Sequence, residues 1–212
     1  VIAWLFVPEA SPRDYLIGAL VLIWAARLGQ FLFRRVLSAG EDRRFREMKT
    51  DFLQFLMTWT LQGLWVAITL SAGLAAMTAS DKLPLDAWAL IGGLVWLVGF
   101  GVEVIADAQK TRFRADPANR EQFIQSGLWA WSRHPNYFGE ILLWFGIALI
   151  AYPVLQGLQN VALISPVFVF VLMNYVSGVR MLEARADRKW GREEAYQAYK
   201  SRTPSLLLRK PR

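Results

Sequence analysis

The sequence predicts an all-α fold, a polytopic transmembrane helix bundle, because it contains three long intervals without charge. Residues 52–80, 87–102 and 141–179 contain no Asp, Glu, Lys or Arg, in a chain that is 55% hydrophobic. Each interval is long enough, or nearly so, for a helix that crosses a bilayer. The last interval holds 39 residues and is interrupted by Pro153, so we divide it into two spans. Together with residues 15–33, five transmembrane helices are predicted.

The basic residues collect on one side of these spans. Segments 34–51, 107–136 and 180–212 carry six, five and ten Lys or Arg residues, whereas the loops on the other side contain only Arg13 and Lys82. By the positive-inside rule the three basic segments are cytoplasmic, and the C-terminus lies with them. We therefore expect an integral membrane protein whose partners include the lipid bilayer and exclude nucleic acid.

The counts of cysteine and histidine limit which metal sites and cross-links the chain can contain. It has no cysteine and one histidine, which excludes disulfides and cysteine-ligated metals and argues against a His-based metal site. It begins at Val1 in the apolar run VIAWLFV, which resembles the end of a span. We expect further residues upstream, and we treat residues 1–212 as a single integral membrane domain.

Within the first span, Arg27 is out of place. It lies about two turns from the basic end of the helix, and a charge at that depth needs an anionic partner. We expect a carboxylate or a cofactor phosphate, the alternative being a side chain that snorkels to the interface. Arg34 and Arg35, just beyond the span, are equally typical of an anchor on anionic lipid.

The third span is rich in glycine and ends in a charged stripe. Gly99 and Gly101 do not form a dinucleotide fingerprint, because no strand precedes them, and they favour close helix packing. Beyond them, four charged residues at offsets 0, 4, 7 and 11 fall within roughly 60° on the helix. We expect this stripe to line a polar cavity, although ion pairs on a solvated face are the alternative for its outer half. The stripe consists of Glu103, Asp107, Lys110 and Arg114.

The fourth span begins in the stretch GLWAWSRHPNYFGE, residues 127–140, around which the chain is organised. Pro135 suits the first helical position, and we expect the amides of residues 136–138 to be unpaired and open to an anion. Asn136 and Glu140 lie four apart on one face of this helix. An acid inside a span is costly and is a functional candidate by default.

The segment after the fifth span (161–179) contains further candidates. Glu183 follows Arg180 by three residues and shares its face, and Tyr196 belongs to an amphipathic helix that ends at Thr203-Pro204. Lying on the membrane surface is the simpler role for the basic residues of that helix. Taken together, arginines near a helix start suit a phosphate-bearing cofactor, and the apolar bundle suits a lipid-like substrate.

These motifs carry a resemblance to a known family. The run GLWAWSRHPNYFGEILLW, together with WAARLGQFLFRRVLSAGEDRRF and an E-x-x-x-D…Y-x-x-Y…TP tail, resembles the steroid 5-alpha-reductase family, especially its bacterial branch. The similarity covers nearly the whole chain. The core RHPNY-x-G-E recurs with variations in sterol C14-reductases and isoprenylcysteine methyltransferases, so the resemblance defines the superfamily better than the reaction.

The resemblance implies seven spans, a bacterial inner membrane location and NADPH-dependent reduction of a steroid or other lipid-like enone. Asn136 and Glu140 would hold the nicotinamide end, and Asp107, Arg114 and Arg27 the ribose and phosphates. Trp24 stands where the animal enzymes have a tyrosine, and the family's catalytic glutamate would lie before Val1, so no proton donor is assigned. The candidate cofactor-binding residues are Arg27, Arg43, Glu103, Asp107, Lys110, Arg114, Arg133, His134, Asn136, Tyr137, Glu140, Arg180, Glu183 and Tyr196.

Two other classes of function remain open. One is a methyltransferase that uses S-adenosylmethionine, and the other is a structural or lipid-binding membrane protein, which leaves the intramembrane carboxylates unexplained. The arginine-rich segments favour NADPH, because guanidinium groups bind phosphate and repel a sulfonium, although the positive-inside bias alone would also explain them. The cofactor that binds decides between the two enzymes.

Overall fold

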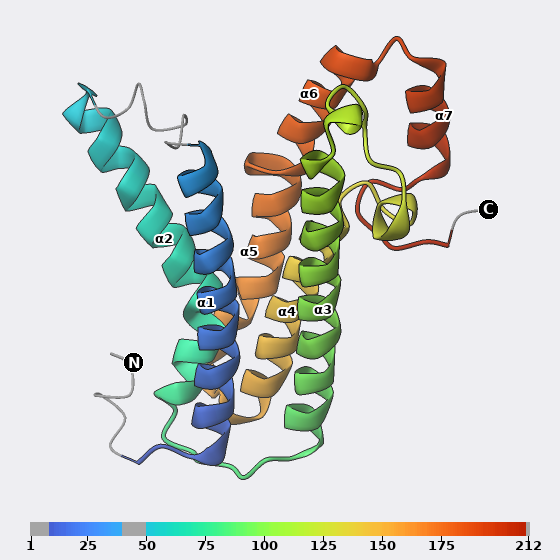
Figure 1. The fold of residues 1–212 in the computed structure, drawn as a ribbon. Coiled ribbons are helices and arrows are strands. Elements are labelled where there is room, and N and C mark those ends of the chain that lie inside the picture. Colours follow the sequence, from blue (N-terminus) through green and yellow to red (C-terminus); the bar gives the residue numbers. More distant parts are fainter. Residues whose placement is uncertain (1–8, 40–49, 211–212) are drawn as a thin grey trace.

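The fold is described from a computed structural model, in which the structure describes residues 9–39 and 50–210. Every regular element in those residues is helical (Figure 1). The α-helices are α1 (Pro12–Ala39), α2 (Phe52–Met77), α3 (Ala87–Ala115), α4 (Pro135–Ala151), α5 (Ser165–Val171), α6 (Val179–Trp190) and α7 (Glu194–Arg202). Shorter 3-10 or π turns are η4 (Pro117–Asn119), η5 (Gly127–Ala130), η6 (Tyr152–Val154), η7 (Gly157–Ile164) and η8 (Leu172–Val176).

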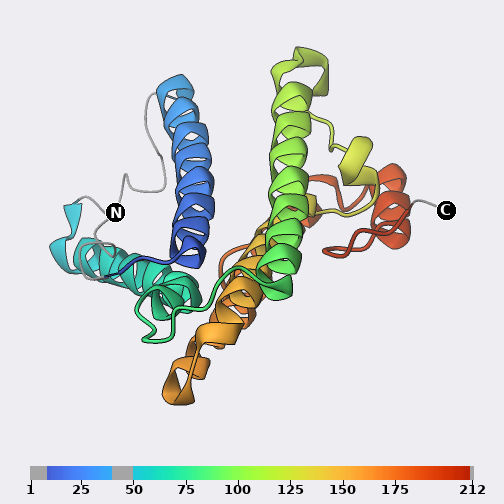
Figure 2. The ribbon, with the colours of Figure 1, turned by 90° about the horizontal axis from the view of Figure 1, so that it is seen from below.

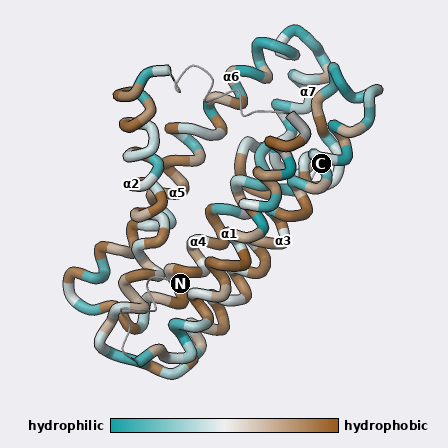
Figure 3. The backbone as a smooth tube through the Cα atoms, turned by 60° about the vertical axis from the view of Figure 1, so that its left-hand side comes forward, coloured by the Kyte–Doolittle hydropathy of each residue, from teal (hydrophilic) through white to brown (hydrophobic). Residues whose placement is uncertain are grey.

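Within the described residues, five helical segments are long and apolar enough to cross a membrane, as predicted. This identifies the chain as an integral membrane protein, and its exposed apolar side chains suit contact with lipid. Figure 3 shows the hydrophobic colour along α1–α5 and the hydrophilic colour over α6 and α7. The candidate spans are Pro12–Arg34, Phe52–Met77, Ala87–Ala115, Pro135–Val154 and Gly157–Trp190.

The predicted division of the long uncharged interval 141–179 is confirmed. Helix α4 ends at Ala151, η6 follows, and Gly157 turns the chain with a φ of +50°, a conformation that glycine adopts without strain. The second half of the interval is less regular than predicted, since three short elements, η7, α5 and η8, follow one another before α6 begins. The continuous helical segment extends to Trp190, eleven residues beyond the predicted end at 179, and its last part is the charged helix α6, which carries Glu183.

Glycines bring α3 and α4 into close contact. A Cβ atom at Gly99 would lie 2.7 Å from the carbonyl oxygen of Gly139, and one at Gly146 would lie 2.6 Å from that of Gly92. These distances leave no room for a side chain, as in small-residue contacts between membrane helices. The prediction of close packing is confirmed for Gly99. It is wrong for Gly101, which has open space beside it because two residues along a helix turn to another face.

The hydrophobic core centres on α4. Trp144, Leu143 and Ile147 are each at most 1% exposed, and Trp96 of α3 and Ile17 of α1 pack into the same cluster. Figure 2 shows α3 running along α4, with α1 and α2 on the other side. Helix α4 contacts α1, α2, α3 and α5, and is therefore the central helix of the bundle.

The end of the bundle opposite α6 and α7 is closed by a buried arginine. Arg13, 1% exposed, donates hydrogen bonds to the carbonyl oxygens of Ile150 (2.6 Å) and Pro84 (2.8 Å). It also pairs with Asp86 at 3.1 Å. One side chain thus joins the start of α1, the loop before α3 and the end of α4, which fixes the bundle at this end.

Candidate functional site

The first part of the site is an interhelical cluster between α1, α3 and α4, made of Trp24, Arg27, Glu103, Asp107, Asn136 and Glu140. The guanidinium of Arg27 forms ion pairs with the carboxylates of Glu103 and Asp107. The Arg27 side chain is 16% exposed and that of Glu103 is 6% exposed. Arg27 therefore has the anionic partner that its depth in the span predicted, and this partner is a pair of carboxylates.

The start of α4 faces Glu103 and Asp107, the inner half of the α3 stripe, whereas Lys110 and Arg114 line a separate cavity described below. Asn136 Nδ2 donates to Asp107 Oδ1 at 3.2 Å, which joins the two helices directly. The glycine contacts described above make this approach possible, since Gly139 lies one turn from Asn136 and a Cβ there would be 2.7 Å from the amide nitrogen of Glu103. Asn136 Oδ1 is left as an acceptor on this side.

Two indole groups hold the carboxylate of Glu140. Trp24 Nε1 donates to Glu140 Oε2 at 3.1 Å, and Trp144 Nε1 donates to Oε1 at 2.9 Å. The two rings pack edge to face with centroids 5.0 Å apart. Trp144 was missed from the sequence, although it follows Glu140 by four residues and so shares its face. The carboxylate is fixed in orientation, and each oxygen keeps a further acceptor site.

The second part of the site is a cavity of about 250 Å³ at the α6–α7 end of the bundle, called the α6–α7 cavity. Its walls are the end of α3, the loop through η5, and one face each of α6 and α7. Six predicted residues line it, namely Lys110, Arg114, Arg133, His134, Glu183 and Tyr196. The other lining residues are Phe123, Ile124, Trp129, Leu182, Arg185, Ala186, Lys189, Trp190 and Tyr199.

The cavity is cationic and aromatic. Lys110 Nζ lies 4.7 Å from the ring centroid of Trp129, and Lys189 Nζ lies 4.9 Å from that of Trp190. Lys189 also pairs with Glu121 at 2.8 Å. No carboxylate of the described residues lies within ion-pair distance of Lys110, Arg114 or Arg185. These three cations remain open to an anionic ligand.

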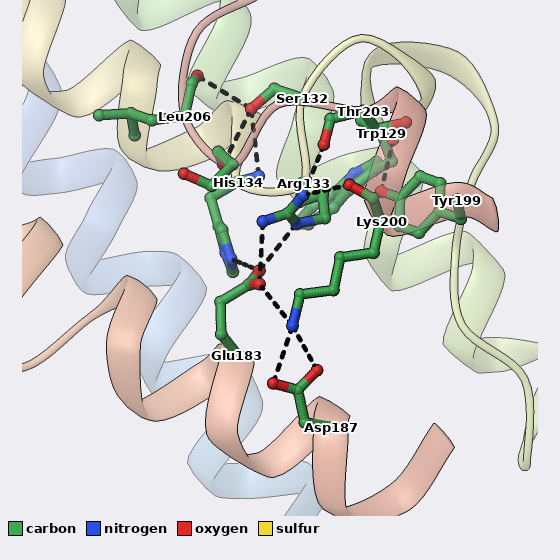
Figure 4. Close-up of polar contacts among 11 residues, drawn as sticks. Trp129, Ser132, Arg133, His134, Glu183, Asp187, Tyr199, Lys200, Thr203 and Leu206 are labelled. Carbon is green, nitrogen blue, oxygen red and sulfur yellow. Dashed lines mark hydrogen bonds and ion pairs between the residues drawn. The ribbon is translucent and has the colours of Figure 1, made fainter. Parts of the chain in front are cut away.

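Arg133 differs from these cations, because protein acceptors occupy its guanidinium (Figure 4). Its Nε and Nη2 donate to the two oxygens of Glu183, both at 3.0 Å. Its Nη1 donates to the carbonyl oxygens of Lys200 (2.8 Å) and Thr203 (2.6 Å). His134 Nε2 lies 2.8 Å from Glu183 Oε1, so one carboxylate serves both residues that precede α4.

The amides at the start of α4 are more fully paired than predicted. Tyr137 N and Phe138 N donate to the carbonyl oxygen of His134 at 3.1 and 3.2 Å. The prediction of unpaired amides is therefore wrong for both. Phe138 is the fourth residue of the helix, and its amide closes the first full turn onto the residue before Pro135.

Two further predicted residues belong to neither set, and a third cannot be placed in either. Tyr137 stacks on His134 of the cavity lining, with ring centroids 5.8 Å apart. Arg180 is exposed, does not line the cavity and lies over the ring of Tyr175. Arg43 lies outside the described residues.

Helix α7 contributes two tyrosines whose hydroxyl groups stay neutral. Burial, together with the nearby carboxylate of Glu183, raises the pKa of Tyr196 to about 12. Burial likewise raises the pKa of Tyr199, whose hydroxyl donates to the carbonyl oxygen of Trp129 at 2.6 Å. At neutral pH the two rings add an aromatic wall and no charge to the cavity.

Comparison with known proteins assigns a family but no activity. A family model described as "Protein of unknown function (DUF1295)" matches residues 1–203. The chain belongs to the DUF1295 family. It is 25% identical over 178 residues to the uncharacterized protein C594.04c of Schizosaccharomyces pombe, an alignment that covers 71% of this chain and 52% of that protein. The chain thus spans about half the length of this curated relative. No solved structure matches it.

The geometry of this DUF1295 protein supports binding of a long, anionic and partly planar ligand. The α6–α7 cavity offers unpaired cations and ring faces, which suit phosphate and an aromatic base. The interhelical cluster offers oriented carboxylate and amide groups, which suit hydroxyl or carboxamide groups. The two parts adjoin at the start of α4, where His134 lines the cavity and Asn136 belongs to the cluster.

Proposed function

We propose that this protein reduces the carbon–carbon double bond of a membrane-soluble, steroid-like enone with NADPH. The observation that carries the proposal is the α6–α7 cavity, where Lys110, Arg114 and Arg185 have no described carboxylate partner beside the rings of Trp129 and Trp190. Three such cations match a cofactor with three phosphate groups. The resemblance of residues 127–144 to the steroid 5-alpha-reductase family supports the same reaction class.

On this proposal, each part of the site has a role. The cations of the cavity hold the phosphates, and the aromatic side chains hold the adenine. Asn136 and Glu140 orient the carboxamide of the nicotinamide, with Trp24 and Trp144 fixing the Glu140 carboxylate. When bound, NADPH supplies a hydride to the carbon β to the ketone. The apolar bundle excludes water and admits the substrate from the bilayer.

The proposal also includes a topology. The three basic segments are cytoplasmic by the positive-inside rule, so the α6–α7 cavity opens to the compartment that contains NADPH. The C-terminus lies on that side of a bacterial inner membrane. The resemblance implies seven spans in the family, and no described residue is assigned as the proton donor to the substrate.

The test uses the purified full-length protein in lipid nanodiscs with NADPH and a 4-ene-3-ketosteroid as the probe enone. We expect NADPH oxidation that depends on the enone, seen at the nicotinamide absorbance band, and a product heavier by two hydrogens in mass spectrometry. Arg114→Met should weaken NADPH binding by about 10- to 100-fold, as for one charge-assisted contact. Arg202→Met is the matched control, because Arg202 is exposed on α7 and its side chain donates to Gln125, which does not line the cavity.

The alternative enzyme has a distinct outcome. Transfer of a labelled methyl group from S-adenosylmethionine, with no binding of NADPH, would replace the reductase proposal with the methyltransferase. The cavity argues against that outcome, because its unpaired cations would repel the sulfonium of that cofactor.

A further inference from the structure

The C-terminal segment, residues 199–209, returns along the chain that leads into α4. Backbone and side-chain hydrogen bonds join it to residues 129–133 at several successive positions, some of which appear in Figure 4. The residues before α4 are therefore hydrogen-bonded to a segment about 70 positions later in the sequence. The bonds run from Tyr199 Oη to Trp129 O (2.6 Å), Arg133 N to Pro204 O (2.9 Å), Ser132 Oγ to Leu206 O (2.9 Å) and Arg209 N to Trp131 O (3.0 Å).

Arg133 is the centre of this arrangement. Two of its nitrogens donate hydrogen bonds to the carboxylate of Glu183 on α6. A third donates to the carbonyl oxygens of Lys200 and Thr203 at the end of α7. Those carbonyls belong to the turn where a helix leaves its acceptors unpaired, and a cation there is favourable. A single side chain thus joins the start of α4 to α6 and α7.

These contacts leave Arg133 few free N–H donors for a ligand. The planar guanidinium has five N–H donors, and four protein contacts use most of them. Among the described residues, the carboxylate in contact with it is that of Glu183, which is shared with His134 and lies 3.8 Å from Lys200 Nζ. A phosphate bound at Arg133 would have to displace these contacts. Arg114, which has no described carboxylate partner, faces no such cost.

We infer that Arg133 is a positioning residue that latches α7 in place as the outer wall of the α6–α7 cavity, and that it does not itself bind phosphate. Helix α7 supplies Tyr196 and Tyr199 to the lining, and the latch determines where those rings lie. Release of the latch moves the wall while the cations on α3 and α6 stay in place. The identity of the ligand in this inference rests on the proposed function, whereas the latch itself does not.

The test compares Arg133→Met with Arg114→Met in the full-length protein in nanodiscs, with Arg202→Met as control. Backbone hydrogen exchange is measured without ligand. We expect exchange of residues 199–209 to rise at least about tenfold in Arg133→Met, because local opening is no longer opposed by the latch. In Arg114→Met, exchange should match the unmodified protein, and Arg202→Met, which removes one exposed hydrogen bond between this segment and Gln125, shows how much a single surface contact contributes. Unchanged exchange of α3 and α4 shows that each variant is folded.

NADPH binding and turnover provide the second readout. In Arg133→Met we expect KM for NADPH to rise about tenfold with kcat within about twofold, since saturating ligand reseats the wall. Saturating NADPH should also restore the slow exchange of residues 199–209. Glu183→Gln, which keeps the shape but removes the charge, should show the same effects at smaller size. Arg133→Lys should recover only part, because lysine lacks the bidentate fork.

Two results would overturn the inference. One is weak NADPH binding in Arg133→Met with exchange of residues 199–209 unchanged, which would make Arg133 a direct phosphate ligand. The other is a rise in exchange spread over α3 and α4 in both Arg133→Met and Glu183→Gln, which would make the contacts general to the fold. If no variant and no parent protein binds NADPH, the proposed function fails, and the exchange experiment still decides whether the latch exists.

Discussion

Replacing Arg27 with methionine tests whether the interhelical cluster holds α1 against α3. The guanidinium pairs with the carboxylates of Glu103 and Asp107, whose side chains are 6% and 12% exposed. Methionine keeps the length but leaves two carboxylates without a cation in an apolar bundle. Removing one partner of a buried ion pair costs about 3–5 kcal/mol. Because Arg27 itself is 16% exposed, we expect the free energy of unfolding to fall by about 3 kcal/mol, at the lower end of that range.

The assay is equilibrium unfolding of the purified protein in mixed micelles, compared at one pH and salt concentration. Adding Glu103→Gln and Asp107→Asn to Arg27→Met removes the uncompensated charges, and this triple variant should recover most of the lost stability. A loss below about 1 kcal/mol in Arg27→Met, as for an exposed ion pair, would refute the reasoning. So would a triple variant no more stable than the single one.

Three further changes test the helix contact, the held carboxylate and the aromatic wall. Gly139→Ala places a Cβ 2.5 Å from a carbonyl oxygen of α3 and should cost about 1–3 kcal/mol, whereas Gly101→Ala, in open space, should stabilise by up to about 1 kcal/mol; equal melting temperatures would contradict this. Trp24→Phe removes a 3.1 Å hydrogen bond to Glu140 and should cost about 1.5–3 kcal/mol in chemical unfolding, and a neutral effect would show that the contact is dispensable. The pKa of Tyr196 rises from 10.0 to about 12 on folding, so its contribution to the free energy of unfolding is full below pH 10 and is lost as the pH rises toward 12. Tyr196→Phe should flatten the plot of stability against pH in that range. An unchanged slope would exclude this residue as the source of the pH dependence.

Local periodicity was enough to predict which polar residues share a face. Asn136 and Glu140 were placed on one side of α4, and the α3 stripe on one side of α3, because the helix repeat fixes those directions. The two faces do meet, as the hydrogen bond between Asn136 and Asp107 shows. The same periodicity would have added Trp144 to the set, had its distance of four residues from Glu140 been used.

Pairings between distant residues were beyond the reach of periodicity. Arg133 and Glu183 were both predicted as candidates. Nothing in their spacing indicates that they pair with each other, since they lie in different segments 50 positions apart. Lys189 and Tyr199 were not predicted to line a cavity. Their roles depend on where α6 and α7 lie relative to the end of α3, because the three elements line one cavity.

The sequence by itself determined the helical class, the five spans, the charge asymmetry of the two ends and the need of Arg27 for an anion. Uncharged length and the high cost of a charge in lipid act within one segment, so they can be read along the chain. The tertiary structure decided which anion meets Arg27, which glycine admits a neighbouring helix, and which arginines remain open to a ligand. Those outcomes depend on contacts between segments, where the side chains that meet are set by the packing of whole helices and not by their order in the sequence.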